Sequence, residues 1–556
     1  MNRSSFRNWC NSGEPFVWLN AGAVSLSIIM VVGLILLIMA RGLGHFWPSD
    51  VAAFDYTDSD GAVVALAGEF IDAESVPRAR LAVGDARVPA YLDIIDRTLV
   101  RIGNRDYTGF DYRWVLDVAM HNLSYPAQIM VIERYEWGNF YGYLTAIKED
   151  GAALHADPDW ALFQRYIAAS QQLLGEIRHI EKSLIGAVNY DMERLRLKER
   201  KLALDGAPEG SPAHTQIATQ RVALQEKYDG YTDRLAGLYE QLNRPSFMAR
   251  LADGREVELA FAKVVRAYRP NAMSVTDKVA FYFEKLWEFV SGDPREANTE
   301  GGIFPAIFGT VMMVMIMAVL VTPFGVVAAV YLREYAKQGP VTRLIRIAVN
   351  NLAGVPSVVY GVFGLGFFVY FLGGTIDELF FPESLPAPTF GTPGILWASL
   401  TLAILTVPVV IVSTEEGLSR VPRAIREGSL ALGATKAETL WRTVLPMTAS
   451  AMMTGLILAV ARAAGEVAPL MLVGVVKLAP SMPLDGNFPF LHLDRKFMHL
   501  GFHIYDVGFQ SPNVEAARPL VYATAFLLVL IIICLNLTAI KIRNRLREKY
   551  RAAEQH

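Results

Sequence analysis

Residues 303–332 read IFPAIFGTVMMVMIMAVLVTPFGVVAAVYL, an apolar run without a charged side chain. A helix needs roughly 20 apolar residues to cross the hydrocarbon core of a bilayer. The run therefore predicts a membrane-spanning helix, Ile303–Leu332. Its Pro305 and Pro323 agree with this, because neighbouring membrane helices can satisfy the backbone groups that proline frees.

Five further apolar runs meet the same length criterion on both sides of this one. They are Val17–Ala40, Ile347–Leu372, Ile395–Val412, Ala449–Val475 and Leu520–Ile540. The first is too long for a cleavable signal peptide and lacks a small-residue cleavage site, so we expect it to stay as an anchor. The chain is thus predicted to cross the membrane six times.

Composition indicates a water-exposed part beside the membrane part. Of the 556 residues, 53% are hydrophobic and 19% are charged, which is too many charges for a chain that is all membrane. The net charge of -3 gives no electrostatic case for binding nucleic acid. Cys10 and Cys534 offer no disulfide framework.

Basic residues beside the spans predict the orientation, since cytoplasmic loops are enriched in Lys and Arg. Loops 333–346 and 420–442 and the tail 541–556 are basic, whereas residues 373–393 carry only acidic charges. Both termini, including residues 1–16, are therefore expected in the cytoplasm of a bacterium, with the chain in its inner membrane. Residues 41–300 are then forced outside, into the periplasm.

This external insert is expected to be an α+β domain carrying a helical arm. Residues 158–204 and 214–243 have apolar residues at alternating steps of three and four, as in a coiled coil, and a Gly/Pro-rich stretch separates them. They predict an antiparallel hairpin over about 158–243. Strand-like alternation occurs in 78–103 and 247–268, with a hairpin turn at 251–255. The arm is either a solvated structural element or a docking arm for an external protein.

The most specific motif lies between the fourth and fifth spans. It consists of Glu427-Gly428-Ser429, then Gly433 after three residues, then Leu445-Pro446. This spacing resembles the cytoplasmic loop of ABC importer permeases, Glu-Ala-Ala, three residues, Gly, nine residues, Ile, one residue, Leu-Pro. Gly428-Ser429 replace the two alanines and Thr443 replaces the Ile. The resemblance implies a coupling loop, about 415–446, that docks on a separate ATPase; an ordinary amphipathic hairpin is the alternative.

The chain contains no phosphate-binding Gly-x4-Gly-Lys-Ser/Thr loop of its own. We therefore expect no cofactor on this chain and no enzymatic activity. ATP and Mg²⁺ would be bound by the partner ATPase.

Four more stretches resemble the phosphate-specific permease family of the PstA type. They are residues 301–310, 351–361, 414–422 and 461–470, so the likeness covers the membrane half and not the insert. It implies a phosphate importer in which the chain pairs with a homologous permease of the PstC type. It also implies a dimer of PstB-type ATPases and a periplasmic phosphate-binding protein as partners.

Arg462 and Glu466 are the candidate transport residues. They lie four apart, on one face of the predicted fifth span. A charge in the middle of a membrane costs about 2.5 to 3.5 kcal/mol, so such residues usually face a cavity or a partner. The planar guanidinium can bind phosphate through two charge-assisted hydrogen bonds, and Glu466 could orient it and compete with the anion. The alternative is an ion pair that only braces a helix loosened by Gly465 and Pro469.

Two other groups of polar residues each allow two interpretations. Asn351, after Asn350, either binds substrate or caps a broken helix before Gly354. His499 and His503 have a spacing seen in some zinc sites, but no other ligand converges in the sequence, so we expect an external helix and no metal site.

The sequence therefore predicts an all-α polytopic membrane protein of the ABC importer permease type, with an external α+β domain. Two other functions stay open. One is a permease of the same architecture for another oxyanion, molybdate or sulfate. The other is a membrane-anchored sensor or scaffold that works through its external arm.

Overall fold

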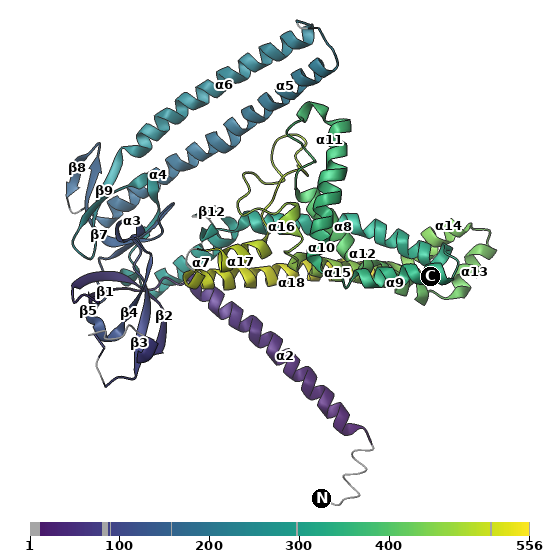
Figure 1. Ribbon diagram of the computed structural model, residues 1–556, viewed down its shortest axis with the longest axis horizontal. Coiled ribbons are helices and arrows are strands. Elements are labelled where there is room, and N and C mark those ends of the chain that lie inside the picture. Colours follow the sequence, from purple (N-terminus) through teal and green to yellow (C-terminus); the bar gives the residue numbers. More distant parts are fainter. Residues whose placement is uncertain are drawn as a thin grey trace, which may run out of the picture.

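The computed structural model describes residues 12–80, 87–88, 91–156, 158–208, 210–295, 298–511 and 514–554 (Figure 1). Most of the predicted N-terminal segment 1–16 lies outside these residues. Within them, six helices are long and apolar enough to span a membrane, as predicted. They are Phe16–Phe46, Phe304–Tyr335, Ser357–Phe380, Ile395–Arg420, Lys436–Gly465 and Ala517–Arg545.

The centre of the membrane bundle is helix α12 (Ile395–Arg420), which α8 (Phe304–Val330) and α15 (Leu445–Gly465) flank. Glycines let these helices approach closely. A Cβ on Gly325 of α8 would lie 2.6 Å from Val410, and one on Gly455 of α15 would lie 2.7 Å from Ser413. The resulting contact buries most of α12, so this helix is the core of the bundle.

All six spans differ from their predicted limits, and two of them are interrupted near a proline. The predicted span 347–372 is broken at Pro356, which separates α9 (Pro340–Leu352) from α10 (Ser357–Phe363). The span then continues through a π-helical stretch into α11 (Gly374–Phe380). The predicted span 449–475 starts at Lys436 instead and ends at Gly465. Proline disfavours helical backbone at the residue before it, which accounts for the break at Pro356.

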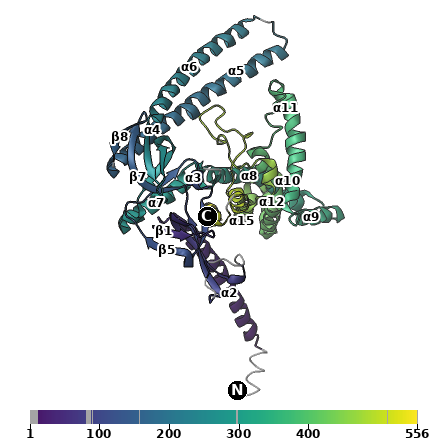
Figure 2. The same ribbon diagram turned by 60° about the vertical axis from the view of Figure 1, so that its left-hand side comes forward.

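The first membrane helix, α2 (Glu14–Leu43), diverges from the bundle (Figures 1 and 2). Near its end it packs on the last helix, α18 (Val514–Glu554), where a Cβ on Gly42 would lie 2.6 Å from the backbone of Ala523. None of its most apolar window is buried by this chain. Its surface is thus left for lipid or for another subunit.

The label all-α is wrong for the whole chain, because the part between α2 and α8 contains two antiparallel sheets. The first has the strand order β4-β3-β2-β1-β5 and the second β10-β9-β7-β6-β11, with β8 on β7. The strands of the first are β1 Val51–Thr57, β2 Val63–Pro77, β3 Ile94–Arg101, β4 Tyr112–Leu116 and β5 Met120–Ser124. Those of the second are β6 Met130–Arg134, β7 Phe140–Glu149, β8 Ala152–Ala156, β9 Pro245–Arg250, β10 Glu256–Ala260 and β11 Val264–Tyr268.

We call these sheets and the helix α7 (Val275–Ser291) the sheet domain. Its β9–β10 turn occurs where the sequence predicted it. The amide of Leu251 donates to the carbonyl of Arg255 at 2.8 Å, and Gly254 has a φ of 89°. Such a left-handed backbone favours glycine, because in other residues the Cβ would crowd the backbone there.

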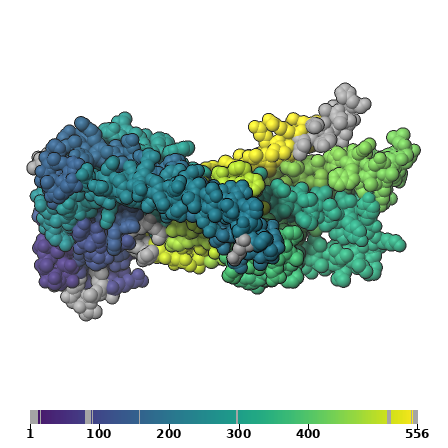
Figure 3. Space-filling model, turned by 90° about the horizontal axis from the view of Figure 1, so that it is seen from above, coloured from purple at the N-terminus to yellow at the C-terminus, as the bar shows by residue number. Residues whose placement is uncertain are grey.

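A pair of long antiparallel helices, the arm, projects from the second sheet. The first long helix of the arm consists of α4 (Trp160–His179), a π-helical turn and α5 (Gly186–Leu204). The second is α6 (Pro212–Asn243). Ile177 and Ile180 pack on Leu238 and Leu242 between them. Seen from above, the arm reaches from the sheets over the membrane part (Figure 3).

The arm contacts the loop between α15 and α18. The hydroxyl of Tyr190 on α5 donates to the carbonyl of Phe488, and its ring lies 6.0 Å from that of His492. The guanidinium of Arg194 lies 6.0 Å from the Phe488 ring. The arm therefore reaches from the sheet domain to the loop between α16 (Leu470–Val473) and α17 (Leu500–Phe509) of the membrane domain.

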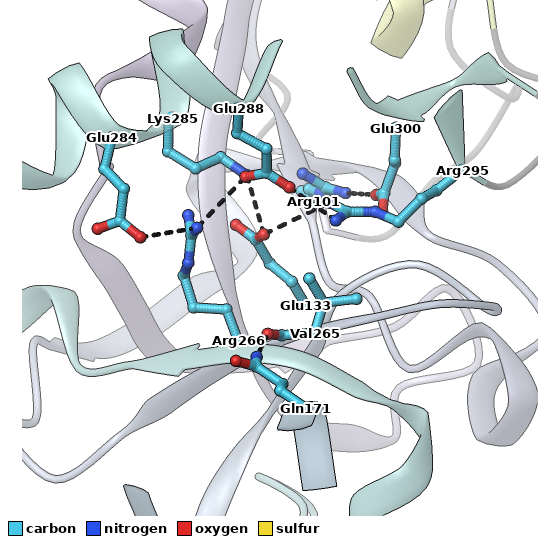
Figure 4. A network of polar contacts seen from close by, with 10 residues as sticks. All are labelled: Arg101, Glu133, Gln171, Val265, Arg266, Glu284, Lys285, Glu288, Arg295 and Glu300. Atoms are coloured by element: carbon cyan, nitrogen blue, oxygen red, sulfur yellow. Dashed lines mark hydrogen bonds and ion pairs between the residues drawn. The ribbon is translucent and has the colours of Figure 1, made fainter. Parts of the chain in front are cut away.

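A network of charged side chains joins the two sheets to α7 and to the start of α8 (Figure 4). Glu133 of β6 lies 2.8 Å from the Lys285 ammonium, and Arg295 lies 2.6 Å from Glu288. Arg101 of β3 lies 2.8 Å from Glu300, just before α8. These groups line a cavity of about 360 Å³ between the sheet domain and the bundle. Because Arg101 belongs to a strand and Glu300 directly precedes α8, their ion pair fixes the sheet domain to the start of α8.

Glu133→Gln is expected to destabilise the sheet domain at neutral pH by about 3 kcal/mol. Burial alone would raise the pKa of Glu133, but Lys285 and Arg266 outweigh it and lower the pKa from 4.5 to about 2. The stabilisation is thus complete above about pH 4.5 and disappears as the pH falls toward about 2. Chemical unfolding of the full chain, followed by tryptophan fluorescence at several pH values, measures it.

The matched control is Glu258→Gln, which removes a carboxylate from an exposed pair with Lys148. Exposed pairs contribute about 0 to 1 kcal/mol, so this variant should unfold almost like the unmodified chain. Equal unfolding of the two variants at neutral pH would contradict the role given to Glu133.

Candidate transport site and coupling loop

The pair Arg462–Glu466 lies where the fifth span ends. The Nε of Arg462 lies 3.6 Å from the Oε1 of Glu466, and 34% and 21% of the two side chains are exposed. Helix α15 stops at Gly465, and Glu466 has the extended angles φ -80° and ψ 133°. The prediction that both residues share one helix face is therefore wrong, although the ion pair forms.

Proline explains the position of this break. Pro469 has no amide hydrogen to donate to the carbonyl of Gly465, and it disfavours helical backbone at Ala468. The chain resumes as a short helix, α16 (Leu470–Val473), after Pro469. The carboxylate thus sits on non-helical backbone inside the membrane domain, an arrangement tolerated where protein or a cavity surrounds it.

The break in the fifth span lies against the break in the third. A Cβ on Gly361 of α10 would lie 2.7 Å from the Cα of Pro469. Beside it, the hydroxyl of the buried Tyr360 donates to the carbonyl of Leu352 at 2.6 Å. Two helix ends and an Arg–Glu pair therefore meet at one place.

Tyr360 is the residue of this site that the sequence analysis missed. It lies in the stretch 351–361, in which Asn351 was the predicted site residue. Asn351 occupies the last turn of α9 with an exposed side chain, and its carbonyl accepts from the amide of Gly354 at 3.0 Å. Any residue at a helix end can accept this bond through its backbone, so both interpretations of Asn351 stay predictions. An aromatic hydroxyl beside a proline break was the available signal for Tyr360.

Gly361→Ala is expected to reduce transport several-fold, because a methyl group cannot fit 2.7 Å from the Pro469 backbone. Overpacking of this kind costs about 1 to 3 kcal/mol, and relief requires α10 to move away from the break. Substrate uptake by the assembled complex measures the effect.

Gly366→Ala supplies the control for this substitution. Gly366 lies in the same membrane span, and a Cβ there would meet nothing within 4 Å. It should transport normally; a loss of equal size in both variants would show that flexibility of the span, and not packing at the break, was changed.

The predicted coupling loop forms two short helical segments at the end of the bundle opposite the sheet domain (Figure 1). Helix α13 (Arg423–Ala431) contains Glu427, Gly428 and Ser429 and ends before Gly433, whose φ is 89°. Helix α14 (Lys436–Thr439) follows, and Thr435 and Glu438 cap it reciprocally. The Ser429 and Thr439 hydroxyls, 2.9 Å apart, join the two segments.

Leu445 and Pro446 lie inside one continuous helix and do not begin a new one. The helix runs from Lys436 to Gly465 through a π-helical turn at Leu440–Val444. Leu445 and Pro446 are thus part of the helix that forms the fifth span. The wider π turn accommodates a proline that cannot donate the usual backbone hydrogen bond.

The loop is braced from within but leaves large apolar side chains uncovered. Arg426 lies 2.9 Å from Glu334, just after α8, and Arg346 of α9 lies 3.1 Å from Glu415 of α12. By contrast, Leu432 is 91% exposed and Trp441 is 72% exposed. A rigid loop that exposes apolar residues has the properties of a docking element.

His499 and His503 are both buried, and burial lowers the pKa of each to about 4. The Nδ1 of His499 accepts from the amide of Gly501 at 3.1 Å and so caps α17 (Leu500–Phe509). Across the described ranges, no group of three or more His, Cys, Asp or Glu side chains could hold a metal ion. His499 thus has a structural role in this helix.

Six apolar helices, a broken-helix site and a loop with exposed apolar side chains are the features of a membrane component of a transport system. Residues 321–548 match the family model described as binding-protein-dependent transport system inner membrane component. The chain is 34% identical over 247 residues to "Phosphate transport system permease protein PstA 1" of Mycobacterium tuberculosis (strain CDC 1551 / Oshkosh), covering 44% of this chain and 71% of that protein. The chain therefore belongs to the PstA family of these membrane components.

Two further similarities concern the same half of the chain. It is 37% identical over 194 residues to "Phosphate transport system permease protein PstA" of Mycobacterium leprae (strain TN), covering 35% of this chain and 58% of that protein. The solved structure of the inward-facing MetNI methionine ABC transporter aligns with 43% of this chain and 94% of its own, at 16% identity and a TM-score of 0.32.

Proposed function

We propose that this chain is the permease subunit of an ATP-driven importer of inorganic phosphate in a bacterial inner membrane. The observation that carries this proposal is the 34% identity to a phosphate transport permease across 71% of that protein's length. The chain forms part of the translocation pathway and does not react with its substrate.

The orientation and partners follow from the coupling loop. Leu432 and Trp441 enter a groove of a PstB-type ATPase, two copies of which bind ATP and Mg²⁺ below the membrane. A homologous PstC-type permease completes the pathway, and a periplasmic phosphate-binding protein delivers the anion. Both termini lie in the cytoplasm, and residues 41–300 with the arm lie outside. The basic loops on the side of the coupling loop support this orientation.

Arg462 is the phosphate ligand of the pathway in this proposal. Its planar guanidinium can make two parallel charge-assisted hydrogen bonds to phosphate oxygens. Glu466, 3.6 Å away, orients the guanidinium and competes with the anion, so that phosphate is released. Because the pair lies on a helix break against α10, a rigid-body shift of either span changes its access between the two sides of the membrane.

The test is ATP hydrolysis by the reconstituted complex of all partner chains, with phosphate, molybdate or sulfate and the binding protein. Phosphate alone should stimulate hydrolysis and be taken up. Stimulation by molybdate or sulfate instead would assign another oxyanion. A complex that contains no ATPase would favour the sensor or scaffold alternative.

The arm is proposed to be the docking element for the external partner, because its helix α5 already contacts the outer loop at Phe488. Deleting residues 158–243 should then weaken binding-protein-dependent uptake. Unchanged assembly and uptake would leave the arm a solvated structural element.

A further inference from the structure

Helix α7 presents apolar side chains in three directions, and this chain covers only two of them. On one side Phe281 packs on Tyr268 of β11, with ring centroids 4.5 Å apart. On a second side Phe289 packs on Phe46 at 4.9 Å, within the apolar cluster at the outer end of the bundle. The helix is thus fixed to the sheet domain and to the membrane domain at once.

The third side is an uncovered stripe of four residues, each four positions after the last. Their exposed fractions are 73% for Val275, 40% for Val279, 61% for Phe283 and 70% for Trp287. At 1.5 Å per residue the stripe is about 18 Å long. None of the four stripe residues is charged, and the neighbouring Glu284, whose side chain is 62% exposed, pairs with Arg266 at 2.9 Å.

Helix α7 lies at the boundary where two membrane helices meet the sheets (Figure 1). The amide of Ile303 donates to the carbonyl of Phe289 at 2.8 Å, and that of Phe304 donates to Gly292 at 3.2 Å. The end of α7 is therefore hydrogen-bonded to the first turn of α8. On the other flank, Phe46 follows directly after α2. Trp287 is thus within about one helical turn of both membrane boundaries.

Exposed aromatic residues of these boundaries extend the stripe. Trp47, 42% exposed after the end of α2, has its ring 6.2 Å from that of Tyr282 on α7. Phe304, the first residue of α8, is 37% exposed. The ring of Tyr282 in turn lies 5.6 Å from that of Phe283, so Trp47 and Tyr282 link the stripe to the end of α2. Trp and Tyr are enriched at this level of membrane proteins, where apolar rings meet polar headgroups.

We propose that the Val275–Val279–Phe283–Trp287 face of α7 lies in the interfacial layer of the bilayer and anchors the sheet domain to lipid. The stripe inserts among the ends of the acyl chains next to the headgroups, as an amphipathic interfacial helix does. Assignment to the outer leaflet rests on the orientation proposed above. Since the stripe is uncharged, its binding needs apolar chains and not an anionic headgroup.

The test places a nitroxide at residue 283 in the full complex in phosphatidylcholine vesicles. Phe283→Cys is made together with Cys10→Ser and Cys534→Ser, and the control is Leu154→Cys in the same background. Leu154 is 49% exposed on β8, at the edge of the second sheet that is drawn far from the membrane helices. The spin label at residue 283 should collide several-fold more often with molecular oxygen than with a water-soluble nickel chelate. The label at residue 154 should collide more often with the nickel chelate.

Two results would overturn the lipid anchor. A nickel accessibility at residue 283 equal to that at residue 154 places the face in water. Shielding of residue 283 from both reagents places it under a protein subunit. If the labelled variant does not assemble, tryptophan fluorescence is measured instead in lipids that are brominated near the headgroup. The bromolipids should quench less fluorescence after Trp287→Phe than before it. Equal quenching with and without Trp287 would refute lipid contact. None of these measurements requires phosphate or ATP, so they are independent of the substrate proposal.

Discussion

Arg462→Ala is expected to lower phosphate uptake by the reconstituted importer about 100-fold or more, while its ATPase chains still bind and hydrolyse ATP. Hydrogen bonds to charged groups contribute about 1.5 to 3 kcal/mol each, and the variant loses two of them to the anion. Each 1.4 kcal/mol corresponds to about tenfold. ATP hydrolysis persists because the coupling loop lies at the other end of α15. Uptake of labelled phosphate and ATP turnover in the same vesicles measure both quantities.

The alternative, a bracing ion pair, predicts a different pattern. If the pair only stabilises the helix end, Arg462→Ala and Glu466→Gln should both reduce assembly and thermal stability to a similar degree. If Arg462 binds phosphate, Glu466→Gln should keep phosphate bound but slow its release, and stability should change little. The control Arg255→Ala removes an arginine paired with Asp253 at 2.7 Å in the β9–β10 turn, and its uptake should be normal. Normal uptake by Arg462→Ala would refute the site.

Leu432→Asp is expected to release the ATPase subunits and to reduce uptake to background. Burying a leucine side chain contributes about 1.5 to 3 kcal/mol, and a carboxylate in the same groove adds the cost of removing an unpaired charge from water. Because Leu432 is 91% exposed in this chain, the substitution should not affect folding. Co-purification of the ATPase with the permease, followed by quantification of both chains, measures the loss.

Leu154→Asp is the matched control for this second effect. It places the same charge on an exposed leucine of the sheet domain, 49% exposed, and should leave the ATPase bound. Retention of the ATPase by Leu432→Asp would mean that α13 and its following turn are not the docking element. Equal loss in both variants would indicate a general effect of the added charge on assembly.

Much of the membrane topology could be predicted from the sequence, because insertion into lipid depends on the apolar length of one segment. Residues 303–332 form a span whichever helices surround them, and the same holds for 395–412. The family likeness was likewise readable from short local motifs. By contrast, the strand pairings of the sheet domain join residues far apart in the chain, such as Ala53 and Ser124, and most of these strands were not predicted.

The sequence by itself thus determined six spans, a large insert and the presence of Arg462 and Glu466. Tertiary structure alone decided that Glu466 lies past the helix end, that Gly361 packs against Pro469, and that α7 keeps one apolar face uncovered. The physical reason is the sequence distance over which the responsible interactions act. A transfer free energy is set by the composition of about 20 consecutive residues. A broken helix, a close approach at Gly361 or an unpartnered face depends on which distant segments pack there.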